Sequence, residues 1–252
     1  MNKCYVQLVG GLGNQLFQIA CGFAYSKKYN KELYLYADRW NAHQGNHPSQ
    51  YQNTIFKNFK FCSSLDGQIE EYNEPKFNYI EIPKYDGNVL LSGFYQSLKY
   101  FNDFKDEIIS LIDLPKINYN PSEFEVAMHI RRGDYLQFYD IHNICSLEYF
   151  EKCLKFFDET VKIHAFTDSK TFVLEEFKNF SKDINIINTN SELEDLSLMS
   201  KYKKIICSNS SFSWWACLLG AEKDLILVPD IWFKNYENHE DIYMDKFTKI
   251  KI

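Results

Sequence analysis

The residues best suited to chemistry lie near the middle of the chain, at the end of an apolar run. Residues 124–130 have the pattern of a buried strand, and at its end stand His129, Arg131, Arg132 and Asp134. The carboxyl ends of strands in α/β sheets face the crevice where ligands bind. Two adjacent guanidinium groups are unfavourable there unless an anion or a carboxylate meets them. The pattern indicates a phosphate site; the alternative is that one Arg pairs with Asp134 and the other faces water.

Two further polar segments follow predicted strands in the same half of the chain. Asp168 comes directly after a strand at 162–167, and its carboxylate can accept hydrogen bonds from the N1–H and N2 amine of guanine. Alternatively, Asp168 or Ser169 caps the helix that follows. A serine-rich run after a strand at 204–207 brings hydroxyls and helix N–H groups to one place, which suits a diphosphate. Its first residues are Ser208, Asn209, Ser210 and Ser211.

A glycine-rich turn near the N-terminus is a weaker candidate. A strand at 4–9 leads into Gly10-Gly11-Leu12-Gly13-Asn14, and a helix at 15–29 follows. Gly11 and Gly13 allow the backbone to approach a ligand closely, and helix N–H groups point towards it. Leu16 stands where a dinucleotide-binding motif requires Gly, so that motif is excluded. Asn14 can reach a ligand or the backbone, and a plain tight turn remains the alternative.

The order of predicted elements favours an α/β fold in two parts. In the C-terminal half, strands at 124–130, 162–167, 184–187, 204–207 and 225–228 alternate with helices at 146–158, 169–180, 191–202 and 210–221. This alternation is typical of a parallel, doubly wound sheet. Ser191 and Glu194 predict a capping box for the third of these helices, and Trp214 and Trp215 are predicted to pack in the core.

The N-terminal half is predicted to be a second α/β domain. Its expected strands are 4–9, 33–36 and 88–94, and its expected helices are 15–29 and 100–114. The first helix is expected to bury Leu16, Phe17, Ala20, Phe23, Ala24 and Lys27. Residues 38–53, with Trp40, His43 and His47, read as a long loop, and 56–81 stay unassigned. Pro115 and Pro121 bracket a linker, which places the boundary near residue 120 and predicts domains at 1–120 and 121–252.

Composition narrows the class of protein. The 252 residues, 45% of them apolar, suffice for one large or two small domains. A formal charge of −6 argues against a non-specific nucleic-acid binder. Seven cysteines without C-x-x-C spacing favour reduced thiols and disfavour a zinc site. No signal peptide or apolar run of ~18 residues is present. We expect a cytoplasmic protein that contacts a membrane, if at all, only peripherally from the cytosolic side.

Three segments resemble the motifs of the α-1,2-fucosyltransferases of glycosyltransferase family 11, in the same order and spacing. They are Gly10-Gly11-Leu12-Gly13-Asn14-Gln15-Leu16-Phe17-Gln18, His129-Ile130-Arg131-Arg132-Gly133-Asp134-Tyr135 and Ser208-Asn209-Ser210-Ser211-Phe212-Ser213-Trp214-Trp215. The resemblance covers most of the chain, from Leu8 to about Pro229. The His-x-Arg-Arg block also resembles a wider superfamily that includes α-1,6- and protein O-fucosyltransferases.

The resemblance implies a GT-B-type fold, with two Rossmann-like domains facing a central cleft, and GDP-L-fucose as the donor. It also implies inversion at the anomeric carbon, with no metal ion and no cofactor. The N-terminal domain would take the acceptor and the C-terminal domain the GDP-fucose. Arg131 would bind the β-phosphate, His129 and Asp168 the guanosine, and Ser208–Ser211 the diphosphate. Arg132 would brace the site from within, while Asn14 and the glycine loop would face the cleft.

The residues themselves agree with a mechanism that needs no metal. No Asp-x-Asp occurs in the chain, so the usual metal–diphosphate clamp of GT-A transferases is missing. Arg131 and helix dipoles must then stabilise the charge that develops on departing GDP. Inversion also requires a base for the proton of the acceptor hydroxyl. Asp134 is the first candidate for that base, and orienting Arg131 or Arg132 is its alternative role.

The leading functional hypothesis is transfer of L-fucose to the 2-hydroxyl of a terminal galactose in a surface glycan, such as an oligosaccharide or glycolipid. Catalytic roles are assigned to Arg131, Asp134 and Asn14. One alternative is fucosylation of another hydroxyl or of a protein. A second alternative, from another class, is a non-catalytic module that binds a GDP-sugar. The acceptor glycan and the oligomeric state are not fixed by the sequence.

Overall fold

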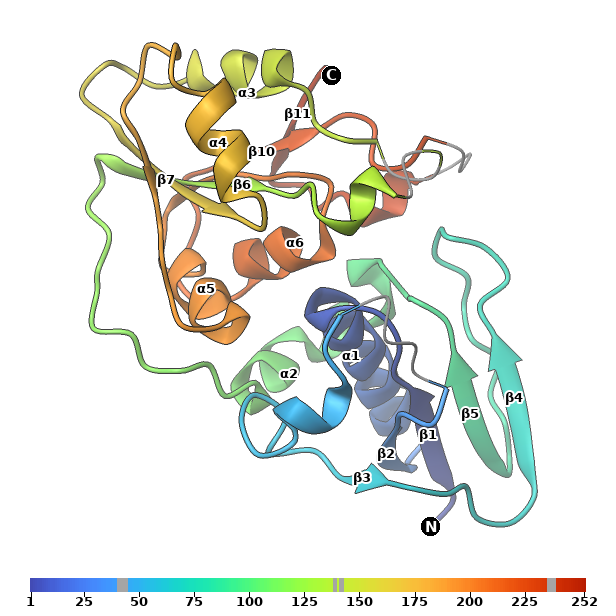
Figure 1. The fold of residues 1–252 in the computed structure, drawn as a ribbon. Coiled ribbons are helices and arrows are strands. Elements are labelled where there is room, and N and C mark those ends of the chain that lie inside the picture. The colour runs from blue at the N-terminus through green and yellow to red at the C-terminus, as the bar shows by residue number, and fades with distance from the viewer. Residues whose placement is uncertain (40–44, 138–139, 141–142, 235–238) are drawn as a thin grey trace. The chain divides into compact units, whose positions relative to one another are not determined.

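The computed structural model describes residues 1–39, 45–137, 140, 143–234 and 239–252, and it divides into two compact units (Figure 1). In this described part, the first unit comprises residues 1–115 and 239–244, and the second comprises residues 116–234 and 245–252. The division falls after Pro115, at the start of the linker predicted between Pro115 and Pro121. The return of a C-terminal segment to the first unit is not anticipated by the sequence.

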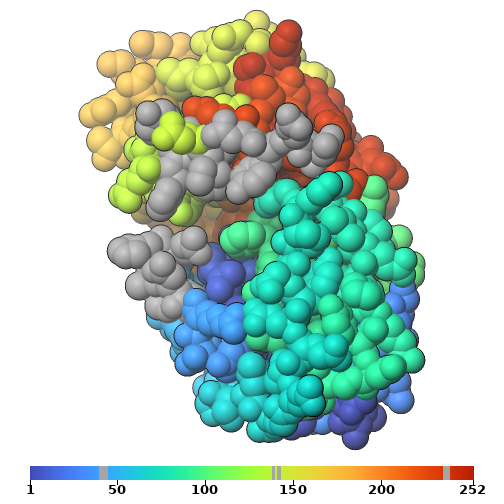
Figure 2. Space-filling model, turned by 90° about the vertical axis from the view of Figure 1, so that its right-hand side faces the viewer, coloured from blue at the N-terminus to red at the C-terminus, as the bar shows by residue number. Residues whose placement is uncertain are grey.

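The first unit is built on a five-stranded parallel sheet with the order β3-β2-β1-β5-β4. The strands are β1 (Lys3–Gln7), β2 (Glu32–Tyr36), β3 (Phe61–Cys62), β4 (Ile69–Asn73) and β5 (Asn88–Ser92). Strands β3 and β4 lie in the region that the sequence leaves unassigned, which covers much of the face of this unit seen in Figure 2. Strands β1 and β5 are parallel neighbours although they are distant in the sequence, so the segments that follow them share one carboxyl edge.

Helix α1 (Leu12–Lys28) follows β1 and packs against β1 and β2. It begins at Leu12, with Gly11 as its N-cap, so Gly13 and Asn14 belong to its first turn and not to the preceding loop. Gly10 has φ +77°, which a residue with a side chain rarely adopts. The prediction that Lys27 faces the core is wrong: it is exposed and pairs with Glu107 at 2.7 Å, as expected for a long charged side chain near a helix end.

Shorter helices complete the first unit. The predicted helix at 100–114 is instead two 3-10 turns, η3 (Leu98–Tyr100) and η4 (Asn102–Phe104), followed by α2 (Lys105–Leu111). In the predicted loop 38–53, Trp40 and His43 lie outside the described residues. A further 3-10 turn, η2 (Pro48–Tyr51), begins after His47, whose side chain accepts a hydrogen bond from Ser49 N. The returning segment carries η6 (Glu240–Ile242).

The second unit has a six-stranded parallel sheet with the order β11-β10-β9-β6-β7-β8. The strands are β6 (Glu125–Ile130), β7 (Lys162–Thr167), β8 (Ile184–Ile186), β9 (Lys204–Ile206), β10 (Leu225–Pro229) and β11 (Phe247–Ile250). Figure 1 shows α3 and α4 on one face of this sheet and α5 and α6 on the other. The prediction of a doubly wound parallel sheet is confirmed, and β11 is an addition at its edge.

The helices of the second unit have recognisable start signals. They are α3 (Leu147–Leu154), α4 (Lys170–Glu176), α5 (Glu192–Met199) and α6 (Ser211–Leu218). The predicted cap of α5 is confirmed, because Ser191 Oγ accepts a hydrogen bond from Glu194 N at 3.3 Å. The Glu194 carboxylate accepts from Asn190 N at 2.9 Å, one residue before the usual partner in a capping box. Trp214 and Trp215 are fully buried, as predicted.

A strained turn follows β5 in the first unit. Tyr95 has φ +51°, a left-handed conformation that is unfavourable for a bulky residue. The carboxylate of Glu74, just after β4, holds this turn by accepting hydrogen bonds from Phe94 N at 2.7 Å and Tyr95 N at 3.1 Å. Burial raises the pKa of Glu74 to about 6, although these hydrogen bonds and one from Tyr100 act in the opposite direction.

The Glu74 carboxylate predicts a specific pH dependence of stability. Because its folded pKa lies above the ordinary value of 4.5, the folded chain binds more protons than the unfolded chain between about pH 4.5 and 6. The free energy of unfolding should therefore fall as pH rises through this window, by on the order of 2 kcal/mol from this group. Urea unfolding of wild type and Glu74→Gln between pH 4.5 and 7 measures the effect as the difference between the two proteins.

Exposed Glu70 on β4 provides the control, since Glu70→Gln removes a charge without touching the turn. Curves for wild type and Glu74→Gln that run parallel across the window would contradict the assignment.

Candidate functional site

The candidate site of the second unit lies where its strand order reverses, between β6 and β9. Ligands of doubly wound sheets bind at the carboxyl ends of the strands beside such a reversal. The segments after β6 and β9 are joined there through one hydroxyl: Ser208 Oγ donates to the carbonyl of His129 at 2.7 Å and accepts from Arg131 N at 3.0 Å. The prediction that these two motifs lie together is confirmed.

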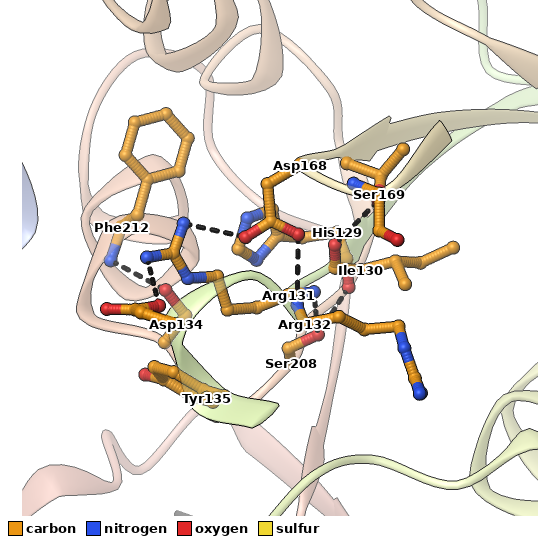
Figure 3. Close-up of polar contacts among 12 residues, drawn as sticks. His129, Ile130, Arg131, Arg132, Asp134, Tyr135, Asp168, Ser169, Ser208 and Phe212 are labelled. Carbon is orange, nitrogen blue, oxygen red and sulfur yellow. Dashed lines mark hydrogen bonds and ion pairs between the residues drawn. The ribbon is translucent and has the colours of Figure 1, made fainter. Parts of the chain in front are cut away.

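Arg131 is held between two carboxylates (Figure 3). Its Nη2 lies 2.6 Å from Asp134 Oδ1, and its Nη1 lies 2.8 Å from Asp168 Oδ2. Burial disfavours the charge on the guanidinium, but Asp168 and Asp134 outweigh this and raise the pKa of Arg131. The pairing with Asp134 considered in the sequence is therefore present, and Asp168 from the end of β7 is a second partner.

Asp168 fixes the loop as well as the guanidinium. Its Oδ1 accepts a hydrogen bond from the backbone N–H of Arg132 at 3.0 Å. Gly133 makes this approach possible, because a Cβ at that position would lie 2.6 Å from Asp168 Oδ2. The alternative that Asp168 or Ser169 caps the next helix is wrong. Ser169 occupies the N-cap of α4 without a capping side-chain hydrogen bond, and Asp168 is turned to the segment 131–133 after β6, which we call the arginine loop.

Arg132 points away from Arg131, as alternation along an extended segment requires (Figure 3). Its guanidinium carbon lies 3.7 Å from the centroid of the Phe172 ring, a cation–π contact. Within the described ranges no carboxylate pairs with Arg132. The expectation that Arg132 braces the site is therefore wrong, because the ion pairs are made by Arg131.

His129 is the buried member of the cluster. Its side chain is 7% exposed, and no described group hydrogen-bonds to its Nδ1. Burial lowers its pKa to about 4, with Arg131 acting in the same direction and Asp168 against it. The imidazole is consequently neutral near pH 7 and has one ring nitrogen that can accept a proton or a hydrogen bond. Its ring lies 5.6 Å from that of Phe212, in the first turn of α6.

The serine-rich run has more internal bonds than its sequence suggests. Ser208 is fully buried in the contacts to β6 described above, and Asn209 is 1% exposed, with its Nδ2 donating to the carbonyl of Trp232 at 2.8 Å. Ser210 caps α6 by accepting from Phe212 N at 3.3 Å. The cluster is thus explained largely by structural hydrogen bonds. Ser211 is the more exposed member, and the first-turn N–H groups of α6 add the positive end of a helix dipole.

In the first unit, the glycine loop presents Gly11 and Asn14, which are both partly exposed, whereas Gly13 is buried within α1. A residue that the sequence analysis does not single out contacts this loop: Gln96 Nε2 donates to Asn14 Oδ1 at 2.7 Å. Tyr135 is a second such residue, since its hydroxyl donates to the carbonyl of Asn209 at 3.0 Å and its ring lies 5.5 Å from the Arg131 guanidinium. The hydrogen bonds of Gln96 and Tyr135 each join segments that are far apart in the sequence.

The arrangement in the second unit can bind an anion through a paired guanidinium, a helix N-terminus and a neutral imidazole. Among the residues with described positions, no three His, Cys, Asp or Glu side chains are grouped so that they could hold a metal ion. Likewise, no helix in the described chain is long and apolar enough to cross a membrane.

The two arginines should differ in their contribution to stability. Arg131→Lys places one ammonium where a planar fork meets two carboxylates, so one carboxylate loses its partner. We expect it to lower the free energy of unfolding by about 1 kcal/mol, and Arg132→Lys to lower it by less than about 0.5 kcal/mol because a lysine can also lie over Phe172. Urea titration of both variants at pH 7 measures this, and a larger loss in Arg132→Lys would contradict the described pairing.

Comparison with known proteins agrees with the sequence motifs. The model of "Glycosyl transferase family 11" matches residues 6–251. An α-1,2-colitosyltransferase of Escherichia coli is 30% identical over the full length of both chains. The O-antigen biosynthesis glycosyltransferase WbnK of Escherichia coli is 24% identical over 98% of this chain and its own full length.

The fold resembles solved structures of a more distant enzyme. The α-1,6-fucosyltransferase NodZ co-crystallized with GDP superposes with a TM-score of 0.57 at 15% identity, covering 91% of this chain and 95% of that chain. NodZ from Bradyrhizobium gives the same TM-score, identity and coverage. This likeness confirms the predicted GT-B-type fold class. Because the family model spans nearly the whole chain, this protein belongs to glycosyltransferase family 11.

Proposed function

We propose that this glycosyltransferase moves L-fucose from GDP-L-fucose to the 2-hydroxyl of a terminal galactose in a glycan, with inversion at the anomeric carbon. The observation that carries the proposal is the position of Arg131 at the switch point of the second sheet, beside the N-terminus of α6. Family membership and an α-1,2-transferring relative support it. The second unit is the donor-binding part, and the first unit, with Asn14, is the acceptor-binding part.

In this proposal the β-phosphate of GDP is the group that Arg131 stabilises. Negative charge grows on that phosphate as the bond from its oxygen to the sugar C1 breaks, so a guanidinium and helix N–H groups bind the transition state more tightly than the ground state. His129 and Asp168 contact the guanosine, and Ser211 with the first turn of α6 contacts the diphosphate. Ser208, Asn209 and Ser210 serve this site by shaping its wall, since their side chains already have protein partners.

The proton of the acceptor hydroxyl must leave as the new bond to C1 forms. We assign it to Asp134, whose carboxylate is 31% exposed and lies on a short 3-10 turn, η5 (Asp134–Leu136), directly after the arginine motif. Donor binding frees this carboxylate, because the phosphate takes its place on Arg131. The alternative is that Asp134 only orients Arg131, and loss of donor affinity without loss of turnover in Asp134→Asn would favour that role.

A second donor is favoured by one observation. The relative that is 30% identical over the whole chain is named for transfer of colitose, the 3-deoxy counterpart of L-fucose. The same Arg131 chemistry applies to any sugar that is carried on GDP, since the charge develops on the diphosphate. A pocket that hydrogen-bonds the fucose 3-hydroxyl would reject colitose strongly, whereas an apolar pocket would discriminate weakly.

The proposed function predicts a defined donor preference without added metal. Purified protein is incubated with GDP-fucose, GDP-colitose, UDP- and CMP-sugars, with lactose or N-acetyllactosamine as acceptor, in excess EDTA and in Mg²⁺. We expect transfer from GDP-fucose, with rates in the two conditions within about tenfold, equivalent to about 1.4 kcal/mol in the barrier. If transfer occurs from GDP-colitose and not from GDP-fucose, the donor in this proposal is GDP-colitose instead of GDP-fucose. A product linked through another hydroxyl would show that the 2-hydroxyl of galactose is not the acceptor position. Binding of a GDP-sugar without transfer would indicate a non-catalytic module.

Base recognition by Asp168 gives a separate prediction. A carboxylate oxygen has two lone pairs, so Asp168 can accept from guanine while it keeps Arg131 and Arg132 N. Asp168→Asn turns one oxygen into a donor that opposes the guanine N–H groups. Calorimetry should show GDP binding weakened by about tenfold or more, with UDP binding changed much less.

The matched control is Asp195→Asn. Asp195 is a partly buried residue of α5 whose carboxylate accepts a hydrogen bond from Thr189 Oγ1 at 2.7 Å, and it has no contact with the arginine loop among the described residues. A preference for GDP over UDP that survives in Asp168→Asn would place base recognition elsewhere and leave Asp168 as a partner of Arg131.

A further inference from the structure

Strands β1 and β5 are parallel neighbours in the first sheet, and two polar segments meet beyond their carboxyl ends. The segment after β1 carries Gly10, Gly11 and Asn14. The segment after β5 carries the left-handed Tyr95, and Gln96 follows it. Ligands of open α/β sheets bind outside the carboxyl ends of the strands. A contact that bridges these loops therefore lies where a substrate of the first unit would be expected.

Gln96 makes that contact and fixes the orientation of one amide. It is 6% exposed, and its Nε2 donates to Asn14 Oδ1 at 2.7 Å. The amino group of Asn14 lies on the opposite side of its amide, against the glycine loop, since a Cβ at Gly10 would lie 2.5 Å from Asn14 Nδ2. The oxygen of Asn14 is thus turned to Gln96, and its N–H groups are turned to the glycine loop, in which Gly11 is partly exposed.

The structure maintains this contact at an energetic disadvantage. Tyr95 is left-handed although it is not glycine, and the Glu74 carboxylate that ties down Phe94 and Tyr95 is itself removed from water. A Cβ at Gly93 would lie 2.4 Å from the Cβ of Glu74, so the turn is also closely packed. Strain that the surroundings hold in place points to a functional constraint on what the turn presents. The side chain presented to the loop is Gln96.

We propose that Gln96 is a positioning residue that sets the amide of Asn14 so that its N–H groups face the substrate hydroxyl or ring oxygen bound at the glycine loop. Glu74 supports Gln96 by holding the turn. The inference rests on the proposed function, in which Asn14 is a catalytic residue of the first unit. It assigns the role to Gln96 because a glutamine amide can donate to Asn14 Oδ1, whereas a side chain that only accepts would turn the Asn14 amide over.

The test compares two substitutions of different chemistry. Gln96→Met keeps the volume and removes the hydrogen bond. Gln96→Glu can restore a bond, but only by accepting from Asn14 Nδ2, which reverses the amide. We expect both to lower kcat by about tenfold, or about 1.4 kcal/mol in the barrier, with KM for the donor changed by less than about twofold. A Gln96→Glu variant as active as wild type would overturn the proposal, because a bond of either polarity would then suffice.

A double-mutant cycle asks whether Gln96 acts through Asn14. In the Asn14→Ala background, Gln96→Met should cause no further loss of kcat, since the amide to be positioned is gone. Ser97→Ala is the control: Ser97 is fully buried in the same turn and its Oγ accepts from Lys99 N at 3.2 Å, but it does not bond to Asn14 in the described structure. Ser97→Ala should lower thermal stability, and its effect on kcat should simply add to that of Asn14→Ala. Full additivity of Gln96→Met with Asn14→Ala would overturn the proposal.

A measurement without turnover separates this inference from the proposed function. The side-chain NH₂ resonances of Asn14, assigned through Asn14→Asp, should shift in Gln96→Met and stay in place in Ser97→Ala. Unshifted resonances in Gln96→Met would overturn the positioning role even if transfer from GDP-fucose is observed. If wild type transfers no fucose, the proposed function fails, while a shift in Gln96→Met still supports the bond that orients Asn14.

Discussion

The structure of the candidate donor site depends on one ionic arrangement, a guanidinium held between two carboxylates at the end of a central strand. Arg131 meets Asp134 on its own loop and Asp168 from the neighbouring strand β7. Such a group is tolerated at a partly buried position because its charge is matched and two of its nitrogens meet carboxylates. Gly133 and Ser208 support this arrangement. Gly133 leaves room for Asp168 to approach, and Ser208 connects the segment after β9 to Arg131 N.

Each sheet brings two polar segments together at the carboxyl ends of neighbouring parallel strands. In the second unit these strands are β6 and β9, where the strand order reverses, and in the first they are β1 and β5, where it does not. In both units a side chain from one segment bonds to the other: Ser208 bonds to the segment after β6, and Gln96 bonds to Asn14 after β1. The carboxyl edge of each sheet therefore brings together polar groups where ligands of α/β sheets bind.

The parts of this arrangement that follow from local patterns could be predicted from the sequence. Parallel strands share one carboxyl edge, so Arg131 and Ser208 could be placed together from strand pattern alone. The pairing of Arg131 rather than Arg132 with Asp168 depends on how the loop turns after Ile130, which strand periodicity does not fix. Short edge strands such as β4, with the sequence Ile-Glu-Glu-Tyr-Asn, lack the apolar pattern of a central strand. The bond from Gln96 joins residues 82 positions apart and requires the strand order itself.

The charges at the donor site indicate which contact must change when a diphosphate binds. Arg131 faces Asp134 and Asp168, His129 is neutral near pH 7 and Arg132 points away, so the cluster is net negative before an anion arrives. A diphosphate adds further negative charge beside these carboxylates, so its binding to Arg131 is favoured when one carboxylate moves away. Asp168 is also bound to Arg132 N and packed against Gly133, whereas Asp134 lies on a short exposed turn. In the proposed mechanism Asp134 is therefore the carboxylate that moves, and a base becomes available only after the leaving group is in place.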